Sequence, residues 1–213
     1  MKKVFLLLVS LVLLSGCTIT RMDTKTYDEV IDKVLSLNIK LSNKVGKGYK
    51  YYAPRGVVRV DANTYNDVLK RDSTTYYLYV DVVSYYNRVI ESFTEDDKAV
   101  YSKSINYEDK YGYIEINKWK NGKYLLEIMY NYAKIEVIVD KSDLEVAFAN
   151  SMIILSSVKY NNDILTNLVG ENVLTSKEIE FNIFETKKTE SNFLEVEANN
   201  DYKEETNDPD LID

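Results

Sequence analysis

The chain has 213 residues, with one Cys, no His, 19 Tyr and a formal net charge of −7. The absence of His excludes Ser-His-Asp and Cys-His catalysis and any histidine-bound metal. A single Cys excludes an intramolecular disulfide and a CxxC site. The acidic balance argues against nucleic acid as a partner, and we expect no metal and no cofactor.

The amino terminus has the plan of an export signal. Lys2 and Lys3 give a short basic start, and residues 4–14 form an apolar run that only Ser10 interrupts. This run is shorter than the roughly 20 apolar residues that a membrane-spanning helix needs. It is typical of a signal peptide, and we expect residues 1–16 to be removed on export.

The signal ends in Leu14-Ser15-Gly16-Cys17, and Cys17 is the only cysteine of the chain. This tetrapeptide resembles the lipobox of bacterial lipoproteins, and the resemblance covers residues 1–17 only. It implies cleavage between Gly16 and Cys17 and a diacylglyceryl group on the Cys17 thiol, which would anchor the chain at the outer face of the cytoplasmic membrane. Two acyl chains hold a protein there stably, whereas one does so only marginally. The alternative is a plain signal peptide followed by an incidental cysteine.

Composition divides the rest of the chain into three parts. Residues 17–24 are predicted to be a polar tether, residues 25–188 a single α+β domain, and residues 189–213 an acidic tail. The tail holds nine acidic residues and one Lys, a net charge of −8, so the predicted domain is nearly neutral. We expect the tail to be disordered, because it cannot bury enough apolar surface to offset its chain entropy. A docking arm for a basic partner is the alternative.

The domain is expected to begin with an amphipathic helix at about Thr26. Thr26 and Glu29 form a capping-box pattern, and Gly46 and Gly48 are expected to end the helix. Apolar residues recur at three- and four-residue spacing along one face, namely Val30, Ile31, Val34, Leu37, Leu41 and Val45.

Strands are expected next. Runs of aromatic and β-branched residues predict them over residues 49–52, 57–60, 75–86 and 100–107. Residues 62–69 are expected to form a loop or one helical turn.

The strongest turn signal is Asn121-Gly122, between predicted strands over residues 111–120 and 123–130. Asn-Gly favours a two-residue type I′ turn, because both positions need a positive φ. Such a turn would set Lys120 opposite Lys123. It would then place six apolar or aromatic side chains on one face, namely Tyr113, Trp119, Tyr124, Leu126, Ile128 and Tyr130. The other face would carry Ile114, Ile116, Leu125 and Met129, so we expect both faces to be covered.

The last predicted elements are a strand over residues 134–139, a helix over 143–158, a short helix over 162–169 and a strand over 179–184. Ser142 and Glu145 suggest a second capping box, and Gly170 is expected to end the short helix. The order predicts an α+β fold, in which an antiparallel β-sheet meander carries the N-terminal helix and one or two later helices packed on it.

Carboxylates are the remaining catalytic candidates, because the GxSxG, P-loop, GxGxxG and HExxH motifs do not occur. Asp81, Glu115, Glu127 and Glu136 all lie in predicted strands. Two carboxylates at the right separation could hydrolyse a glycosidic bond. The sequence brings no two of them together, and polar positions at the solvated edges of a sheet explain them more simply.

Tyrosines form the second candidate site. Alternation along residues 75–86 places Tyr77, Tyr79, Asp81 and Tyr85 on one side of that strand. The predicted ligand face joins these residues to Tyr113, Trp119, Tyr124 and Tyr130 of the hairpin. Such a face could hold a glycan, a peptide or an acyl chain. The alternative is that the tyrosines fill the margin of the core and pair across strands.

The sequence therefore predicts a membrane-anchored lipoprotein with a non-enzymatic binding or structural role at the cell envelope. Its partners would be the membrane, through acylated Cys17, and an envelope glycan, lipid or protein. Two alternatives stay open. A carrier of a lipid or another hydrophobic ligand would enclose an apolar cavity between sheet and helices, and a carboxylate hydrolase would place two acidic residues in a cleft.

Overall fold

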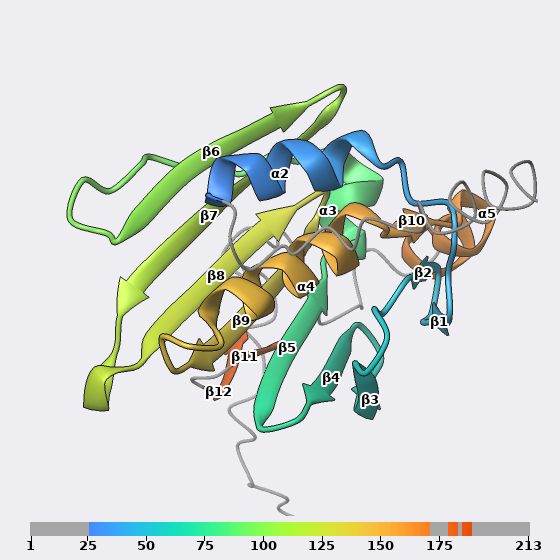
Figure 1. Cartoon of the computed structure of the whole chain (residues 1–213). Helices are drawn as coiled ribbons and strands as arrows, with labels where there is room; N and C mark the ends of the chain where they lie inside the picture. Colours follow the sequence, from blue (N-terminus) through green and yellow to red (C-terminus); the bar gives the residue numbers. More distant parts are fainter. Residues whose placement is uncertain (1–25, 171–178, 183–184, 189–213) are drawn as a thin grey trace, which may run out of the picture.

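The computed structural model describes residues 26–170, 179–182 and 185–188 (Figure 1). The predicted signal peptide, tether and acidic tail lie outside these residues. Within the part that is described, no helix is both long enough and apolar enough to cross a membrane.

A seven-stranded antiparallel sheet organises the described residues, in the order β3-β4-β5-β9-β8-β7-β6. Its strands are β3 (Val58–Asn63), β4 (Asn66–Arg71), β5 (Thr74–Val80), β6 (Tyr101–Tyr107), β7 (Lys110–Lys118), β8 (Tyr124–Tyr130) and β9 (Ala133–Val139). Between β5 and β6, α3 (Val82–Asn87) and residues 88–100 carry the chain to the far edge of the sheet. The chain then returns strand by strand until β9 pairs with β5.

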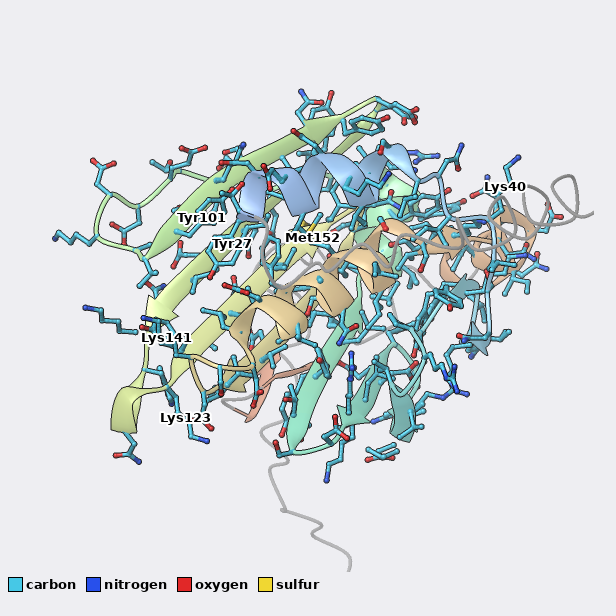
Figure 2. The ribbon with its side chains drawn as sticks, in the orientation of Figure 1. Tyr27, Lys40, Tyr101, Lys123, Lys141 and Met152 are labelled. Carbon is cyan, nitrogen blue, oxygen red and sulfur yellow. The ribbon has the colours of Figure 1, made fainter. Side chains whose placement is uncertain are left out.

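Two helices, α2 (Tyr27–Ser36) and α4 (Leu144–Ser156), cover one face of this sheet (Figure 1). They contact each other, and α4 also contacts β8 and β9. The side chains of Leu78, Phe148 and Met152 are fully buried there, and Figure 2 labels Met152 on α4. This arrangement confirms the predicted α+β class.

Smaller elements complete the described residues. The strands β1 (Lys44–Val45), β2 (Tyr49–Tyr51) and β10 (Lys159–Tyr160) form a second sheet in the order β1-β2-β10. The helix α5 (Asn162–Leu165) continues into a π-helical turn, η3 (Thr166–Gly170), where the sequence predicted one short helix. The predicted last strand is shorter, because β11 (Ile179–Asn182) pairs with β12 (Glu185–Lys188) as a hairpin.

The N-terminal helix begins where the sequence predicts and ends earlier. The Thr26 hydroxyl accepts a hydrogen bond from the Glu29 backbone N–H, and the Glu29 side chain completes the capping box. The helix stops at Ser36, and Asn38 has a φ of 42°, a left-handed conformation that no helix can continue. Leu41 is consequently 68% exposed and does not belong to the apolar face.

Residues 62–69 were predicted as a loop or helical turn, and this prediction is wrong. They contain the end of β3, a tight turn and the start of β4. Every residue of β3 is exposed, because it is an edge strand. It therefore lacks the apolar alternation by which a half-buried strand is recognised.

The strand predicted over residues 75–86 is too long. β5 ends at Val80, and Asp81 caps α3, since its Oδ1 accepts a hydrogen bond of 2.7 Å from the Ser84 backbone N–H. A side-chain cap of this kind satisfies a backbone donor at the start of a helix. This cap overrides the strand preference of the tyrosines and valines around it. Asp81 and Tyr85 therefore do not continue the row of Tyr77 and Tyr79.

The β7–β8 loop (residues 119–123) has the predicted turn residues but not the predicted length. Asn121 and Gly122 have φ values of 58° and 72°, as an Asn-Gly turn requires. The Trp119 backbone N–H, however, donates to the Lys123 carbonyl oxygen at 2.7 Å, and the Lys123 N–H donates to Lys120. Trp119 and Lys120 thus both face Lys123, as two residues face one at a β-bulge.

This extra residue shifts the pairing of β7 with β8 by one position. Tyr113 lies opposite Met129, whereas the two-residue turn would have set it opposite Tyr130. A shift of one residue in one strand moves its side chains to the other face of a sheet. The predicted common face of Tyr113, Tyr124 and Tyr130 is therefore wrong, because Tyr113 lies on the face opposite to the other two.

The helix predicted over residues 143–158 is confirmed as α4, but its predicted capping box is wrong. The N-cap residue is Asp143, and no side chain caps the helix there. Ser142 lies one residue too early to accept from the first turn. The position of α4 is determined by burial instead, since Leu144, Phe148 and Leu155 are buried along its length.

Candidate functional site

We call the face of the seven-stranded sheet opposite α2 and α4 the open face, because neither helix covers it, although Tyr79 and Glu136 on this face are buried. Strand pairing across it places Tyr77 opposite Glu136, Glu136 opposite Glu127, and Glu127 opposite Glu115. Three carboxylates thus stand in one row on neighbouring strands. The sequence could not predict this row, because it depends on the register of two hairpins. Asp81, the fourth carboxylate considered, lies outside the row as the cap of α3.

Neighbouring polar side chains partner these glutamates. The Tyr113 hydroxyl donates to Glu127 at 2.6 Å, and the Lys134 Nζ lies 3.2 Å from a carboxylate oxygen of Glu136. Like charges directly opposite each other destabilise a sheet, and such partners offset part of that repulsion. In the described ranges, no group of three or more acidic, His or Cys residues is placed to hold a metal ion.

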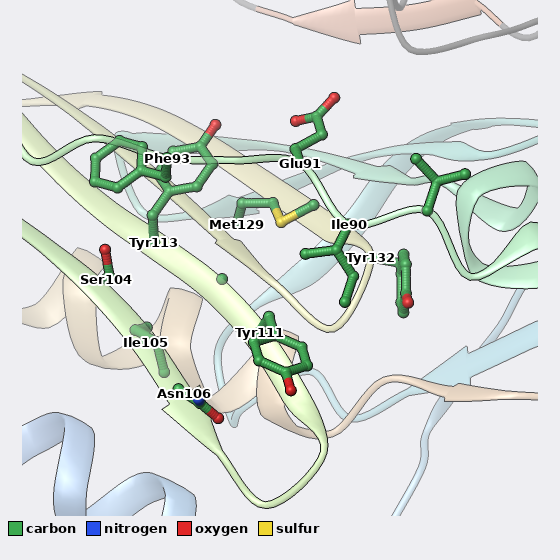
Figure 3. A pocket seen from close by; sticks show the side chains of 12 residues that line it. Ile90, Glu91, Phe93, Ser104, Ile105, Asn106, Tyr111, Tyr113, Met129 and Tyr132 are labelled. Carbon is green, nitrogen blue, oxygen red and sulfur yellow. The ribbon is translucent and has the colours of Figure 1, made fainter.

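A small cavity lies between the open face and the segment that follows α3. Phe93 of this segment stacks on Tyr113, with ring centroids 4.2 Å apart and ring planes 3° from parallel. The cavity beside this stack has a volume of about 250 Å³ and is drawn in Figure 3. We call it the Phe93 pocket. Its walls include Ile90, Phe93, Tyr111, Tyr113, Met129 and Tyr132.

The end of α3 directs the chain over the open face to form one wall of this pocket. Arg88 is the C-cap of α3 and has a φ of 59°, in the left-handed region where helices commonly end. Val89 and Ile90 follow, and they are 42% and 54% exposed. The mouth of the Phe93 pocket therefore presents two neighbouring apolar side chains to solvent, which is a feature of binding sites when it adjoins a cavity.

The β8–β9 turn forms a second wall. Its two residues, Asn131 and Tyr132, have φ values of 53° and 60°, as in the type I′ turns that suit two-residue hairpins. Asn tolerates this conformation, but for Tyr it costs about 1 kcal/mol or more. The Tyr132 ring meets the Tyr85 ring edge-on at 5.6 Å. Tyr132 thus occupies a backbone conformation for which Gly would be the less strained residue.

Beside the Phe93 pocket lies the tyrosine cluster, which comprises Tyr85, Tyr132 and Tyr160. Tyr85 stacks on Tyr160 with centroids 3.7 Å apart, and the Arg88 guanidinium lies 4.6 Å from the Tyr85 centroid. The tyrosine cluster borders a more polar cleft of about 580 Å³, which Lys159 also lines. Tyr132 and Ile90 line both this cleft and the Phe93 pocket, so the two sites are neighbours.

The structure divides the predicted ligand face among four places. Tyr77, Tyr79 and Tyr113 lie on the open face, Asp81 and Tyr85 belong to α3, Trp119 lies in the β7–β8 loop, and Tyr124 and Tyr130 lie on the helix-covered face. Tyr79 and Tyr130 are only 4% and 2% exposed and act as core residues. Of the predicted face, Tyr113 lines the Phe93 pocket.

Several residues of the Phe93 pocket escaped the sequence analysis. Ile90 and Phe93 lie in a segment without periodicity, so no pattern assigns them to a helix or strand. Tyr132 lies in a turn between two predicted strands. The one signal in the sequence was the short apolar stretch Val89-Ile90 among polar residues. Whether such a stretch lines a pocket depends on which parts of the fold it packs against.

A buried polar cluster elsewhere has a structural role. Asp67 is 2% exposed, accepts a hydrogen bond of 2.5 Å from the Tyr51 hydroxyl, and lies 3.3 Å from the Arg59 guanidinium. Burial, and then the charge of Asp67, raise the pKa of Tyr51 well above its usual range, so Tyr51 stays protonated and donates. These contacts join the small sheet to β4, and none of the three residues lines the Phe93 pocket.

A comparison with protein families identifies the beginning of the chain. Residues 1–18 match the model of the prokaryotic membrane lipoprotein lipid attachment site. The match confirms the lipoprotein signal segment and supports anchoring in the membrane through a lipidated cysteine, of which Cys17 is the only one present. Among curated proteins, none matches the chain.

Proposed function

We propose that this membrane-anchored lipoprotein binds an apolar ligand group in the Phe93 pocket, on the extracytoplasmic side of the membrane and without catalysis. The kind of signal that residues 1–18 match supports export as part of this proposal. The observation that carries the proposal is the pocket itself. It has a stacked aromatic wall, Phe93 on Tyr113, and an exposed apolar side chain, Ile90, at its mouth.

The size and chemistry of the pocket define the class of ligand. Its volume of about 250 Å³ lies just below the range of pockets that hold drug-sized molecules, about 300–1,000 Å³. It suits an aromatic group or a short stretch of acyl chain, as part of an envelope peptide, lipid or glycolipid. Ser104, Asn106 and Glu91 supply polar groups in the lining, which could orient the ligand.

The alternatives have less support. A carrier would need its cavity between the sheet and the helices, where the side chains of Leu78, Phe148 and Met152 are fully buried in the core. A carboxylate hydrolase requires acidic residues in a cleft, and the glutamates of the open-face row do not line the Phe93 pocket. A purely structural role at the cell envelope is the alternative that a binding experiment must exclude.

The test uses the chain from residue 18 onward in detergent-free buffer. Decanoate and benzyl alcohol, probes for an acyl chain and an aromatic group, are titrated into it by calorimetry. We expect at least one probe to bind, and Ile90→Asp to weaken its binding at least tenfold, because the variant places a charge at the apolar mouth. Val58→Asp is the matched control, since Val58 on β3 is also 54% exposed.

Two results would contradict the proposal. Failure of both probes to bind the wild-type chain would leave the structural role as the better account. Equal affinities for wild type and Ile90→Asp would show that binding occurs elsewhere.

A further inference from the structure

One end of the sheet carries a compact basic surface. Within residues 118–123 there are three Lys, one Trp and no acidic residue. Lys118 and Lys120 are exposed and Trp119 is half-buried, with the Lys120 Nζ 5.8 Å from the Trp119 ring centroid. Lys141, in the loop after β9, lies at the same end of the sheet as Lys123 (Figure 2). We call Lys118, Trp119, Lys120, Lys123 and Lys141 the basic tip.

The first described helix begins at this same end. The Tyr27 ring at the start of α2 lies 4.9 Å from the ring of Tyr101, at the start of β6. Tyr101 pairs with Ile116, two residues before the basic tip begins at Lys118. Figures 1 and 2 show the start of α2 and the β7–β8 loop at one end of the sheet.

The chain between the anchor and the domain is short. Residues 18–25 separate Cys17 from Thr26. Even a fully extended chain of this length spans no more than about 30 Å, at roughly 3.5 Å per residue. That is about the length of β7, so the end of the sheet where α2 begins must stay within one strand length of the membrane surface.

Acidic side chains also lie near this end, and one of them pairs with a lysine of the basic tip. Lys123 lies 3.7 Å from Asp140, and both side chains are largely exposed. Glu95 accepts a hydrogen bond from the Ser104 backbone N–H at 2.8 Å, and the Asp96 N–H donates to Ser102 at 3.0 Å. These bonds hold the acidic segment along the first half of the edge strand β6, which begins at the same end of the sheet as the basic tip.

We propose that the basic tip contacts the anionic headgroups of the membrane in which the protein is anchored, and so gives the domain a fixed orientation. Lysines near an anionic surface are attracted to it, and Trp favours the headgroup level because one part of its ring is apolar and its N–H is polar. The lipid anchor keeps the local concentration of membrane high, so a weak contact is sufficient. The inference rests on the lipid anchor and is independent of the Phe93 pocket.

The test exploits the fact that Trp119 is the only tryptophan of the chain. The full lipidated protein is reconstituted into vesicles of phosphatidylcholine alone or with about one third phosphatidylglycerol, each with or without brominated acyl chains. We expect bromine to quench Trp119 fluorescence at least twice as strongly in the anionic vesicles. Salt at 0.5 M should remove the difference, because it screens exposed charges.

Charge-reversal variants decide whether the basic tip is responsible. Lys118→Glu with Lys120→Glu should reduce quenching in anionic vesicles to the level in neutral ones. Lys47→Glu with Lys50→Glu is the matched control, because these exposed lysines lie just before β2 and in β2, and Figure 1 shows β2 at the other side of the molecule from β6 and β7. Equal quenching in both kinds of vesicle, or an equal loss in the control variant, would overturn the proposal. If the charge-reversal variant stays bound to the vesicles but its Trp119 is no longer quenched, the loss is due to the basic tip and not to failure of the lipid anchor.

Discussion

At the scale of single residues, the Phe93 pocket depends on a close approach between two strands. Gly112 of β7 contributes to its lining. A Cβ atom at this position would lie 2.0 Å from the Met129 carbonyl oxygen and 2.7 Å from the Tyr130 Cα. Both atoms belong to the backbone of β8, so neither can rotate away. Gly112 is therefore required both for the pairing of β7 with β8 and for the wall of the Phe93 pocket.

We predict that Gly112→Ala lowers the free energy of unfolding by about 2 kcal/mol or more, because a backbone contact of 2.0 Å forces the two strands apart. Urea denaturation followed by circular dichroism measures this. Gly122→Ala is the comparison, since nothing lies within 4 Å of its Cβ and only its φ of +72° opposes the substitution. It should cost about 1 kcal/mol. A Gly112→Ala chain as stable as the wild type would refute the described pairing of β7 and β8.

At the scale of elements, α2 is fastened to the sheet edge at its first turn. The Asp28 carboxylate accepts a hydrogen bond of 2.9 Å from the Tyr101 hydroxyl and pairs with Lys103 on β6. The hydrogen bonds from Lys103 and Tyr101 lower the pKa of Asp28. A carboxyl group whose pKa is lowered by folding stabilises the folded state above its unfolded pKa, about 3.9, and loses this contribution as pH falls through the folded value.

We therefore expect this contact to make a small contribution to the free energy of unfolding, which is lost at acid pH. Asp28→Asn should lower the stability at pH 7 by a few tenths of a kcal/mol, since Asp28 is exposed and the pair is screened by solvent. The difference from wild type should shrink as the pH falls below about 4. Thermal melting between pH 7 and pH 3 measures it, and Lys103→Met should show the same loss. A difference that stays constant down to pH 3 would contradict the assigned role of this pair.

Some features of the helices and strands were predictable from local sequence, and others were not. The capping box of Thr26 and Glu29 was predictable, because both partners lie within one turn of the chain. The positive φ values of Asn121 and Gly122 were predictable for the same reason. The register of their hairpin was not, because the extra residue at Trp119 is fixed by pairing and packing along the whole of β7 and β8.

At the scale of the whole molecule, the basic tip and the Phe93 pocket lie at opposite ends of the sheet. Tyr111 and Tyr132 of the pocket are next to the β6–β7 and β8–β9 turns, whereas the basic tip lies at the other end of β7. With the basic tip on the membrane, the pocket would face away from the bilayer. A ligand would then come from the envelope space or from a partner there, and not directly from the membrane.

The sequence revealed the anchor but not the pocket, and the reason is physical. A lipobox is recognised as a linear peptide, so the residues up to Cys17 suffice to predict it, and residues 1–18 match the corresponding family model. The Phe93 pocket is built from a segment after α3, from β6 and β7, and from the β8–β9 turn. These parts come together only through the pairing of the strands, and no local sequence pattern predicts such contacts between distant segments.

The state of Cys17 tests the account most directly. The protein is expressed in bacteria with its own signal and partitioned between detergent and aqueous phases, alongside Cys17→Ala, and the N-terminal peptide is analysed by mass spectrometry. We expect the wild type to enter the detergent phase and to begin at a Cys17 that carries a diacylglyceryl group. We expect Cys17→Ala to lack the lipid and to leave the detergent phase once its signal is removed. A wild-type chain that begins elsewhere without lipid, or a lipid-free processed Cys17→Ala chain that partitions like the wild type, would contradict the account.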